Sequence, residues 1–115
     1  MNNSSIVGRL TKDPEKHITE AGLEISKFTI AINDFKETEF VTCKAFDNNA
    51  KFVNSFLKKG FTIAVTGRIK TDTYDASGEK RYFTYVNVYS VEGVDEESEK
   101  WEDHYGYKEP NQLGA

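Results

Sequence analysis

The chain has 115 residues, of which 37% are hydrophobic and 30% charged, and its formal net charge is −4. That length suits one domain with a single modest core, and no apolar run approaches the roughly 20 residues of a membrane helix. The first ten residues lack the layout of a secretory signal, and the lone Cys43 excludes an internal disulfide framework and a cysteine-based zinc site, so we expect a cytoplasmic protein.

The first part of the chain predicts two strands. Residues 4–13, SSIVGRLTKD, form the first, in which Gly8 indicates a bulge or a close approach of two backbones. The second strand follows a turn at residues 20–22. Its Phe28 and Ile30 form a core face, because successive side chains of a strand point to opposite sides.

Residues 40–46, FVTCKAF, predict a third strand with two different faces. The small apolar side chains, which suit a core, are those of Val41, Cys43 and Ala45. The opposite face carries two large rings, a hydroxyl and a cation: Phe40, Thr42, Lys44 and Phe46. This mixture raises the question of why two phenylalanines should lie on an outward face.

The period of the apolar residues changes after this strand. Residues 47–60, DNNAKFVNSFLKKG, offer Asp47 or Asn48 as a helix cap, apolar residues at helical spacing, and Gly60 as a stop. The segment predicts one amphipathic helix of about three turns.

Two strands joined by a turn at residues 75–80 follow the helix. In residues 61–74, FTIAVTGRIKTDTY, the predicted core face consists of Phe61, Ile63, Val65, Gly67 and Ile69. Residues 81–91, RYFTYVNVYSV, form the last strand. Five strands with one helix between the third and the fourth is the layout of the OB-fold, a five-stranded Greek-key barrel. We assign the barrel to residues 1–93 and a solvated acidic tail to residues 94–115.

The acidic charge is concentrated at the C-terminal end. Residues 1–91 contain 13 Lys and Arg against 11 Asp and Glu, a net charge of +2. Residues 92–115 contain 2 against 8, a net charge of −6. The acidity of the whole chain therefore says little about the surface of the barrel.

Basic and aromatic residues interleave on the outward faces of the predicted strands. Arg68, Lys70 and Tyr74 lie on the outward face of the fourth strand, and Phe35 precedes the third. A protein that holds single-stranded nucleic acid needs this mixture, because cations follow the phosphates and flat rings stack on bases of any identity. The alternative is that a loop or a subunit partner covers these rings, since phenylalanine is often buried.

Other chemistry finds little support. Cys43 faces the core, His17 and His104 have no partner at a spacing that suggests a catalytic triad, and no Gly-rich phosphate loop occurs. The acidic tail lacks the regular spacing of a calcium loop. We therefore expect no enzyme activity, no cofactor and no metal.

Four motifs resemble the bacterial and phage single-stranded DNA-binding protein family: VGRLTKDPE at 7–15, FTIAIN at 28–33, FLKKG at 56–60 and GRIKTDTY at 67–74. The resemblance covers residues 1–92. It implies an OB barrel, usually a homotetramer with a dimer as the alternative, that is not an enzyme. Its implied function is sequence-independent binding and protection of single-stranded DNA in replication, recombination and repair.

The resemblance also implies where the chain contacts DNA. The base-stacking rings carried over by position are Phe35, Phe40, Phe46 and Tyr74. The phosphate-binding candidates are Lys44, Lys58, Lys59, Arg68 and Lys70, and Arg9 and Lys12 complete the set.

Two departures from the family's pattern concern the loop before the third strand and the tail. The loop is shorter than is typical, which shrinks the expected footprint on DNA. The chain ends in NQLGA where members typically close in Asp-Ile-Pro-Phe, so recruitment of replication or recombination proteins through the tail is in doubt. Together these features suggest a phage or plasmid-borne member, which would act in the host cytoplasm.

Two other functions remain open. One is an OB-fold accessory protein of the primosome or recombination class that acts mainly through protein contacts. The other is an RNA-binding module of the cold-shock type, although its aromatic-rich strand is not evident.

Overall fold

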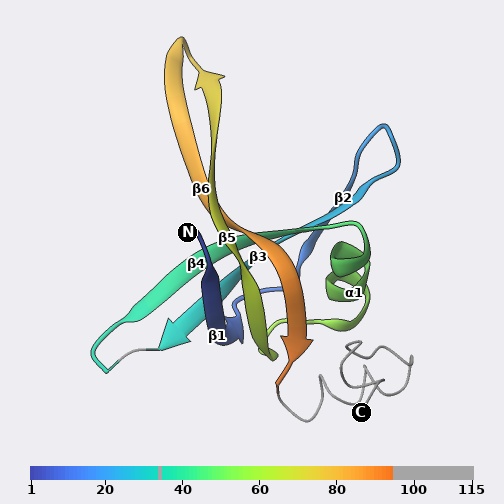
Figure 1. The fold of residues 1–115 in the computed structure, drawn as a ribbon, viewed down its shortest axis with the longest axis vertical. Helices are drawn as coiled ribbons and strands as arrows, with labels where there is room; N and C mark the ends of the chain where they lie inside the picture. Colours follow the sequence, from blue (N-terminus) through green and yellow to red (C-terminus); the bar gives the residue numbers. More distant parts are fainter. Residues whose placement is uncertain (34, 95–115) are drawn as a thin grey trace.

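The computed structural model describes residues 1–33 and 35–94. Figure 1 shows the elements in chain order: β1 (Ser4–Leu10), β2 (Glu15–Ile18), β3 (Glu24–Asn33), β4 (Thr38–Phe46), α1 (Asn48–Phe56), β5 (Thr62–Ala76) and β6 (Glu79–Gly93). Within these two ranges, no helix has the length and apolar character needed to cross a membrane.

Five of the strands close into a ring. The hydrogen-bonded order is β1-β5-β6-β4-β3, and β1 also pairs with β3, which joins the two ends of the series. The contact between β4 and β6 is parallel, with Cys43 opposite Val86, and the other pairings of the ring are antiparallel. The ring, with α1 between its third and fourth strands, is the predicted OB-fold, and the fold class is confirmed.

A short sixth strand, β2, lies outside the ring and was not predicted. It pairs only with β3, and all four of its side chains are exposed. A polar segment of this kind carries no periodic apolar signal, because its order comes from backbone pairing along the edge of β3. The turn predicted between the two is confirmed: the Thr19 N–H donates to the Leu23 carbonyl at 2.9 Å, and Gly22 has a φ of 89°.

The helix is shorter than predicted. It ends at Phe56, because Leu57 turns extended (φ −102°, ψ 141°) and buries its side chain in the core. Gly60 still ends the segment, with a φ of 91° and its N–H donating to the Leu10 carbonyl at 2.9 Å. Lys58 and Lys59 therefore lie in the loop after the helix.

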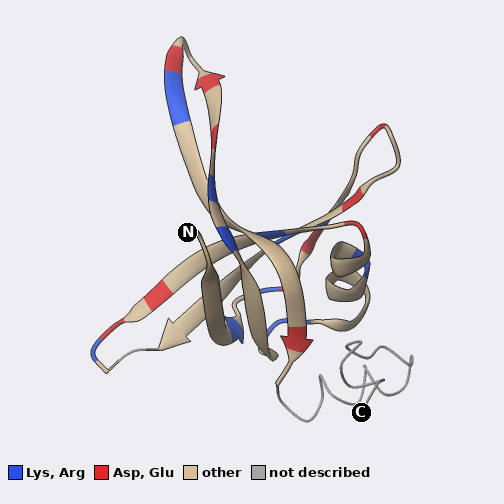
Figure 2. Cartoon of the chain, viewed as in Figure 1, with Lys and Arg blue, Asp and Glu red and all other residues tan. Residues whose placement is uncertain are grey.

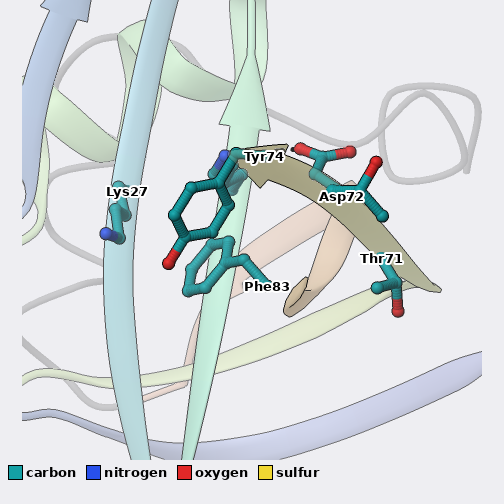
Figure 3. A pocket seen from close by; sticks show the side chains of 7 residues that line it. Lys27, Thr71, Asp72, Tyr74 and Phe83 are labelled. Carbon is teal, nitrogen blue, oxygen red and sulfur yellow. Dashed lines mark ion pairs between the residues drawn. The ribbon is translucent and has the colours of Figure 1, made fainter. Parts of the chain in front are cut away.

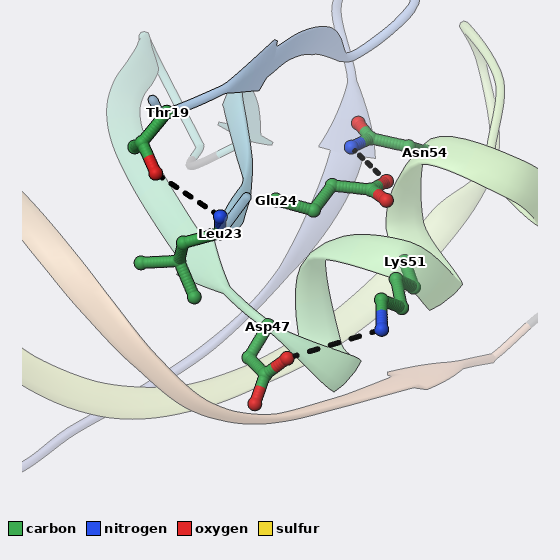
Figure 4. Close-up of polar contacts among 6 residues, drawn as sticks. All are labelled: Thr19, Leu23, Glu24, Asp47, Lys51 and Asn54. Carbon is green, nitrogen blue, oxygen red and sulfur yellow. Dashed lines mark hydrogen bonds and ion pairs between the residues drawn. The ribbon is translucent and has the colours of Figure 1, made fainter. Parts of the chain in front are cut away.

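Polar contacts hold α1 against the end of β3 (Figure 4). The Asn54 side chain donates to Glu24 Oε2 at 2.8 Å, and Lys51 Nζ lies 4.0 Å from Asp47 Oδ1. Asp47 occupies the cap position, as predicted, but its side chain makes no capping hydrogen bond. The apolar side of the helix covers one end of the barrel core.

The core contains the predicted inward residues of the strands. Phe28, Ile30, Ile63 and Val65 are all buried, and Cys43 is fully enclosed. Burial raises the pKa of the Cys43 thiol to about 12, so it stays protonated and unreactive at neutral pH. This confirms Cys43 as a core residue.

Two glycines permit close approaches of the backbone. A Cβ on Gly8 would lie 2.3 Å from Ile30 Cγ2, and one on Gly67 would lie 2.1 Å from the Asn87 carbonyl oxygen. The ladder between β5 and β6 shifts register at Thr66/Gly67, and beyond this bulge the two strands leave the barrel as a long hairpin (Figure 1). Ile69 was predicted to face the core, but it lies in this hairpin and is 51% exposed.

Candidate nucleic-acid interface

The outer surface of β3 and β4 is set by their register. Antiparallel partners share a face. Outward pairs run along the two strands in the order Ile25 with Phe46, Lys27 with Lys44, Thr29 with Thr42, and Ala31 with Phe40. Two lysines therefore lie directly opposite each other, with a phenylalanine on either side of them along β4.

The projecting β5–β6 hairpin presents a second set of side chains to this surface. Asp72 is opposite Phe83 in the ladder, and Lys70 is opposite Tyr85, so these four share one face with Tyr74. The other face carries Thr73 and its partner Tyr82, among others.

Cation–π contacts connect the two sets of residues. The Lys27 and Lys44 ammonium groups lie 4.9 and 5.1 Å from the centre of the Phe83 ring. Lys44 Nζ is also 4.5 Å from the centre of the Tyr85 ring, and the two rings stack at 5.6 Å. Lys27 is exposed, and contacts of this kind at exposed sites are worth about 0.5–1 kcal/mol each, so together they help to hold the hairpin over β3 and β4.

Two hollows meet at the lysine pair. Figure 3 shows the first, into which Lys27, Asp72, Tyr74 and Phe83 project. Its lining consists of Lys27, Lys44, Thr71, Asp72, Thr73, Tyr74 and Phe83. The lining of the second consists of Glu15, Lys16, His17, Ile25, Lys27 and Lys44. Because Lys27 and Lys44 line both, the hollows adjoin at these two lysines, and we call the two hollows together the lysine groove.

Two carboxylates line the lysine groove, Glu15 and Asp72, and the second of them is paired with a groove lysine. Asp72 Oδ2 is 3.8 Å from Lys44 Nζ. Burial raises the pKa of Tyr85, as do the hydrogen bond from its hydroxyl to Asp72 and the negative charge of that residue, whereas Arg68 lowers it. The Tyr85 hydroxyl therefore stays protonated at neutral pH and donates a hydrogen bond to Asp72.

The predicted rings take different positions. Tyr74, 53% exposed, lines the lysine groove. Phe40, 66% exposed, lines a neighbouring hollow together with Thr42 and Tyr85. Phe46 is half-buried beside Ile25, and Phe35 is fully exposed in the loop between β3 and β4. Phe40 and Phe46 thus lie on the outward face that the alternation predicts.

Three of the predicted cations belong to this surface. Lys44 lies in the groove, and Arg68 and Lys70 lie on the groove face of the hairpin, where Figure 2 marks basic positions at the point at which the hairpin leaves the barrel. Arg9 is opposite Ala31 on β3, which places it on the outer surface two strands from Phe40.

The remaining predicted cations, Lys12, Lys58 and Lys59, lie in two loops and do not line the groove, although Lys12 contacts Glu15 at its edge. The Lys59 N–H donates to Asp13 Oδ1 at 2.9 Å and joins these loops. Lys12 Nζ lies 3.3 Å from Glu15 Oε1.

Sequence reasoning missed several residues of the groove. Lys27, Phe83 and Tyr85 were not selected, nor were Lys16 and His17 on β2. The signal for Lys27 is its outward position between the buried Ser26 and Phe28. Alternation within β6 likewise places Phe83 and Tyr85 on one face, but only the contact with β4 shows that this face meets the lysines.

Comparisons with known proteins point to one family. The model of the single-strand binding protein family matches residues 1–94. A single-stranded DNA-binding protein of Clostridium perfringens is 35% identical over 120 residues, covering 100% of this chain and 80% of that protein. Single-stranded DNA-binding protein A of Bacillus subtilis is 34% identical, covering 96% of this chain and 69% of that protein.

Single-stranded DNA-binding protein 3 of Listeria innocua is 41% identical over 100 residues. That match covers 80% of this chain and 62% of the Listeria protein, so it spans less than two-thirds of this relative's length. The family match extends through the whole ring of strands. The chain belongs to the single-strand binding protein family.

Proposed function

We propose that this protein binds single-stranded DNA without regard to sequence and protects it during replication, recombination and repair. The observation that carries the proposal is the lysine groove, in which Lys27 and Lys44 lie beside the rings of Tyr74 and Phe83. Ammonium groups neutralise phosphates, and aromatic rings stack on bases at about 1–3 kcal/mol each.

The rings account for the preference for single strands. A base must leave its stack to lie on Tyr74 or Phe40, and only an unpaired strand offers its bases at little cost. When the phosphates of the DNA enter the groove, Lys27 and Lys44 exchange their contacts with Phe83 for contacts with these phosphates. The Phe83 ring is then free to stack on a base. The same residues thus serve both the free and the bound protein.

The proposed DNA path runs along the outward rings and cations. Its stacking positions are Phe35, Phe40, Phe46 and Tyr74, with Phe83 added from the groove geometry. Its phosphate positions are Lys27, Lys44, Arg68, Lys70 and Arg9. Contacts to Lys12, Lys58 and Lys59 require the strand to continue past the groove to the loops that Asp13 joins.

We also propose a homotetramer, with a dimer as the alternative. The outer face of β1 and β5 supports it, because Val7 is 57% exposed and is opposite Ala64 in the ladder, while Ser5 is opposite Thr66. Small uncharged side chains surround Val7 on this face, beside Arg9, and an exposed apolar side chain in such surroundings suits association between copies of one chain.

The protein acts in this proposal as a binding module in the cytoplasm and not as an enzyme. Residues 1–93 form the DNA-binding domain and residues 94–115 a tail through which replication or recombination proteins are recruited. All of the tail from residue 95 onward lies outside the described residues. The family membership and the cation-and-ring composition of the groove support the binding role.

A titration of labelled oligo-dT by fluorescence anisotropy tests the function. We expect tight binding that weakens with salt and that duplex DNA does not displace, because the duplex hides its bases from the rings. Equal competition by duplex would contradict the proposal. Stronger competition by oligo-U would favour the RNA-binding alternative, and weak binding of every nucleic acid would favour a function in protein contacts.

Replacing Lys27 and Lys44 together by glutamine tests the phosphate path. We expect the plot of log K against log salt for oligo-dT to become shallower by about 0.7 to about 1.4, because each lost phosphate contact to a single strand removes about 0.7 and Lys44 is paired with Asp72. Lys51→Gln, on the helix, is the matched control for lost charge. An unchanged slope in the double variant would place the path elsewhere, and an equal fall in Lys58→Gln/Lys59→Gln would extend it to the loops.

A further inference from the structure

We propose that Asp72 acts as a built-in competitor of DNA phosphate: it holds Lys44 in the free protein and thereby lowers the affinity of the groove for single strands. This inference rests on the proposed function. It concerns a residue that opposes binding, whereas the rings and lysines around it promote binding.

The position of Asp72 is fixed by β5. It is opposite Phe83 in the ladder, so its side chain points to the groove face of the hairpin, and it lines the first hollow on the side of Tyr74 away from Lys27 (Figure 3). Its Oδ2 atom lies 3.8 Å from Lys44 Nζ. The side chain of Lys44 is 24% exposed and that of Asp72 46%, so the pair is open to solvent on the side from which DNA would enter.

Tyr85 orients this carboxylate. Its hydroxyl hydrogen-bonds to Asp72, while Lys44 lies over its ring at 4.5 Å. The Asp72 carboxylate, the Lys44 ammonium group and the Tyr85 side chain therefore form one cluster of mutual contacts. Asp72 therefore interacts with both Lys44 and Tyr85, and the 3.8 Å ion pair fixes which cation it opposes.

A phosphate that binds Lys44 meets this carboxylate first. It either displaces Asp72 from the ammonium group or binds beside a like charge, and both raise the free energy of the complex. While Lys44 stays paired with Asp72 it does not neutralise a phosphate, so one counterion fewer is released from the DNA. Single-stranded DNA therefore dissociates more readily from this groove than from one with two unpaired lysines.

Asp72→Asn tests the inference, because asparagine keeps the size and an acceptor oxygen for Tyr85 but loses the charge. We expect about three- to tenfold tighter binding of oligo-dT at low salt. The slope of log K against log salt should steepen by up to about 0.7, one phosphate contact to a single strand. Asp75→Asn is the matched control, since Asp75 is opposite Lys80 in the ladder and lies on the other face of the same hairpin.

Repeating both substitutions in a Lys44→Gln background separates the route from simple charge repulsion. We expect Asp72→Asn to give no gain there, because no ammonium group remains to be released. An equal gain in both backgrounds, or an equal gain from Asp75→Asn, would overturn the role of Lys44. Weaker binding by Asp72→Asn would show that the carboxylate contacts DNA favourably and would overturn the inference while leaving the proposed function intact. Failure of the unsubstituted protein to bind oligo-dT would instead overturn the proposed function and this inference with it.

Discussion

Replacing Phe40 and Tyr74 together by alanine is expected to weaken oligo-dT binding at least about thirtyfold, because each ring stacks a base at about 1–3 kcal/mol. Both rings are more than half exposed, and they lie on β4 and on the hairpin that faces it. Anisotropy titrations at a fixed salt concentration give the change, and circular dichroism checks that the barrel remains folded.

Tyr82→Ala is the matched control for this variant. Tyr82 is 67% exposed on the same hairpin as Tyr74, but it is opposite Thr73 on the other face of the ladder and is not among the residues that line the groove. We expect its loss to change the affinity less than about twofold, within the ±0.5 kcal/mol usual for isolated surface positions. A loss as large as that of the Phe40/Tyr74 variant would move the stacking path to the far side of the hairpin.

Replacing Phe28 by alanine is expected to lower the free energy of unfolding by about 3–5 kcal/mol, the usual range for a buried phenylalanine. Phe28 is 2% exposed and is opposite Cys43 in the ladder, inside the closed ring of strands. Losing its ring leaves a cavity. The surrounding strands cannot close it, because each of them is hydrogen-bonded to a neighbouring strand on both of its edges.

Urea denaturation, with the slope of the transition compared between variants, measures this change. Phe40→Ala provides the contrast, since the same side chain is removed from the outer surface of β4, where we expect a loss below about 1 kcal/mol. If Phe40→Ala instead cost as much as Phe28→Ala, its ring would belong to a packed interior and not to a binding surface.

The two faces of the strands could be predicted from the sequence because the side-chain period of a strand is two. In FVTCKAF that period alone separates the buried Cys43 and Ala45 from the outward Phe40 and Lys44. The OB-fold followed in the same way from the order of elements and the change of period at the helix. The two outward phenylalanines on this strand are accounted for if they receive the bases of a single strand, as we propose.

The tertiary structure decided which outward residues meet. Lys44 and Phe83 are far apart in the sequence, and they come together only through the parallel contact of β4 with β6 and the bulge at Gly67 that aims the hairpin. The sequence also could not place β2, whose order depends on pairing with β3, or the end of the helix, where Leu57 leaves the helix to enter the core. Local periodicity determines which side of its own strand a side chain takes, whereas the groove depends on register between distant strands. For that reason the sequence by itself determined the rings and lysines of β4 and β5, and only the closed barrel determined that Lys27, Phe83, Tyr85 and Asp72 complete one site with them.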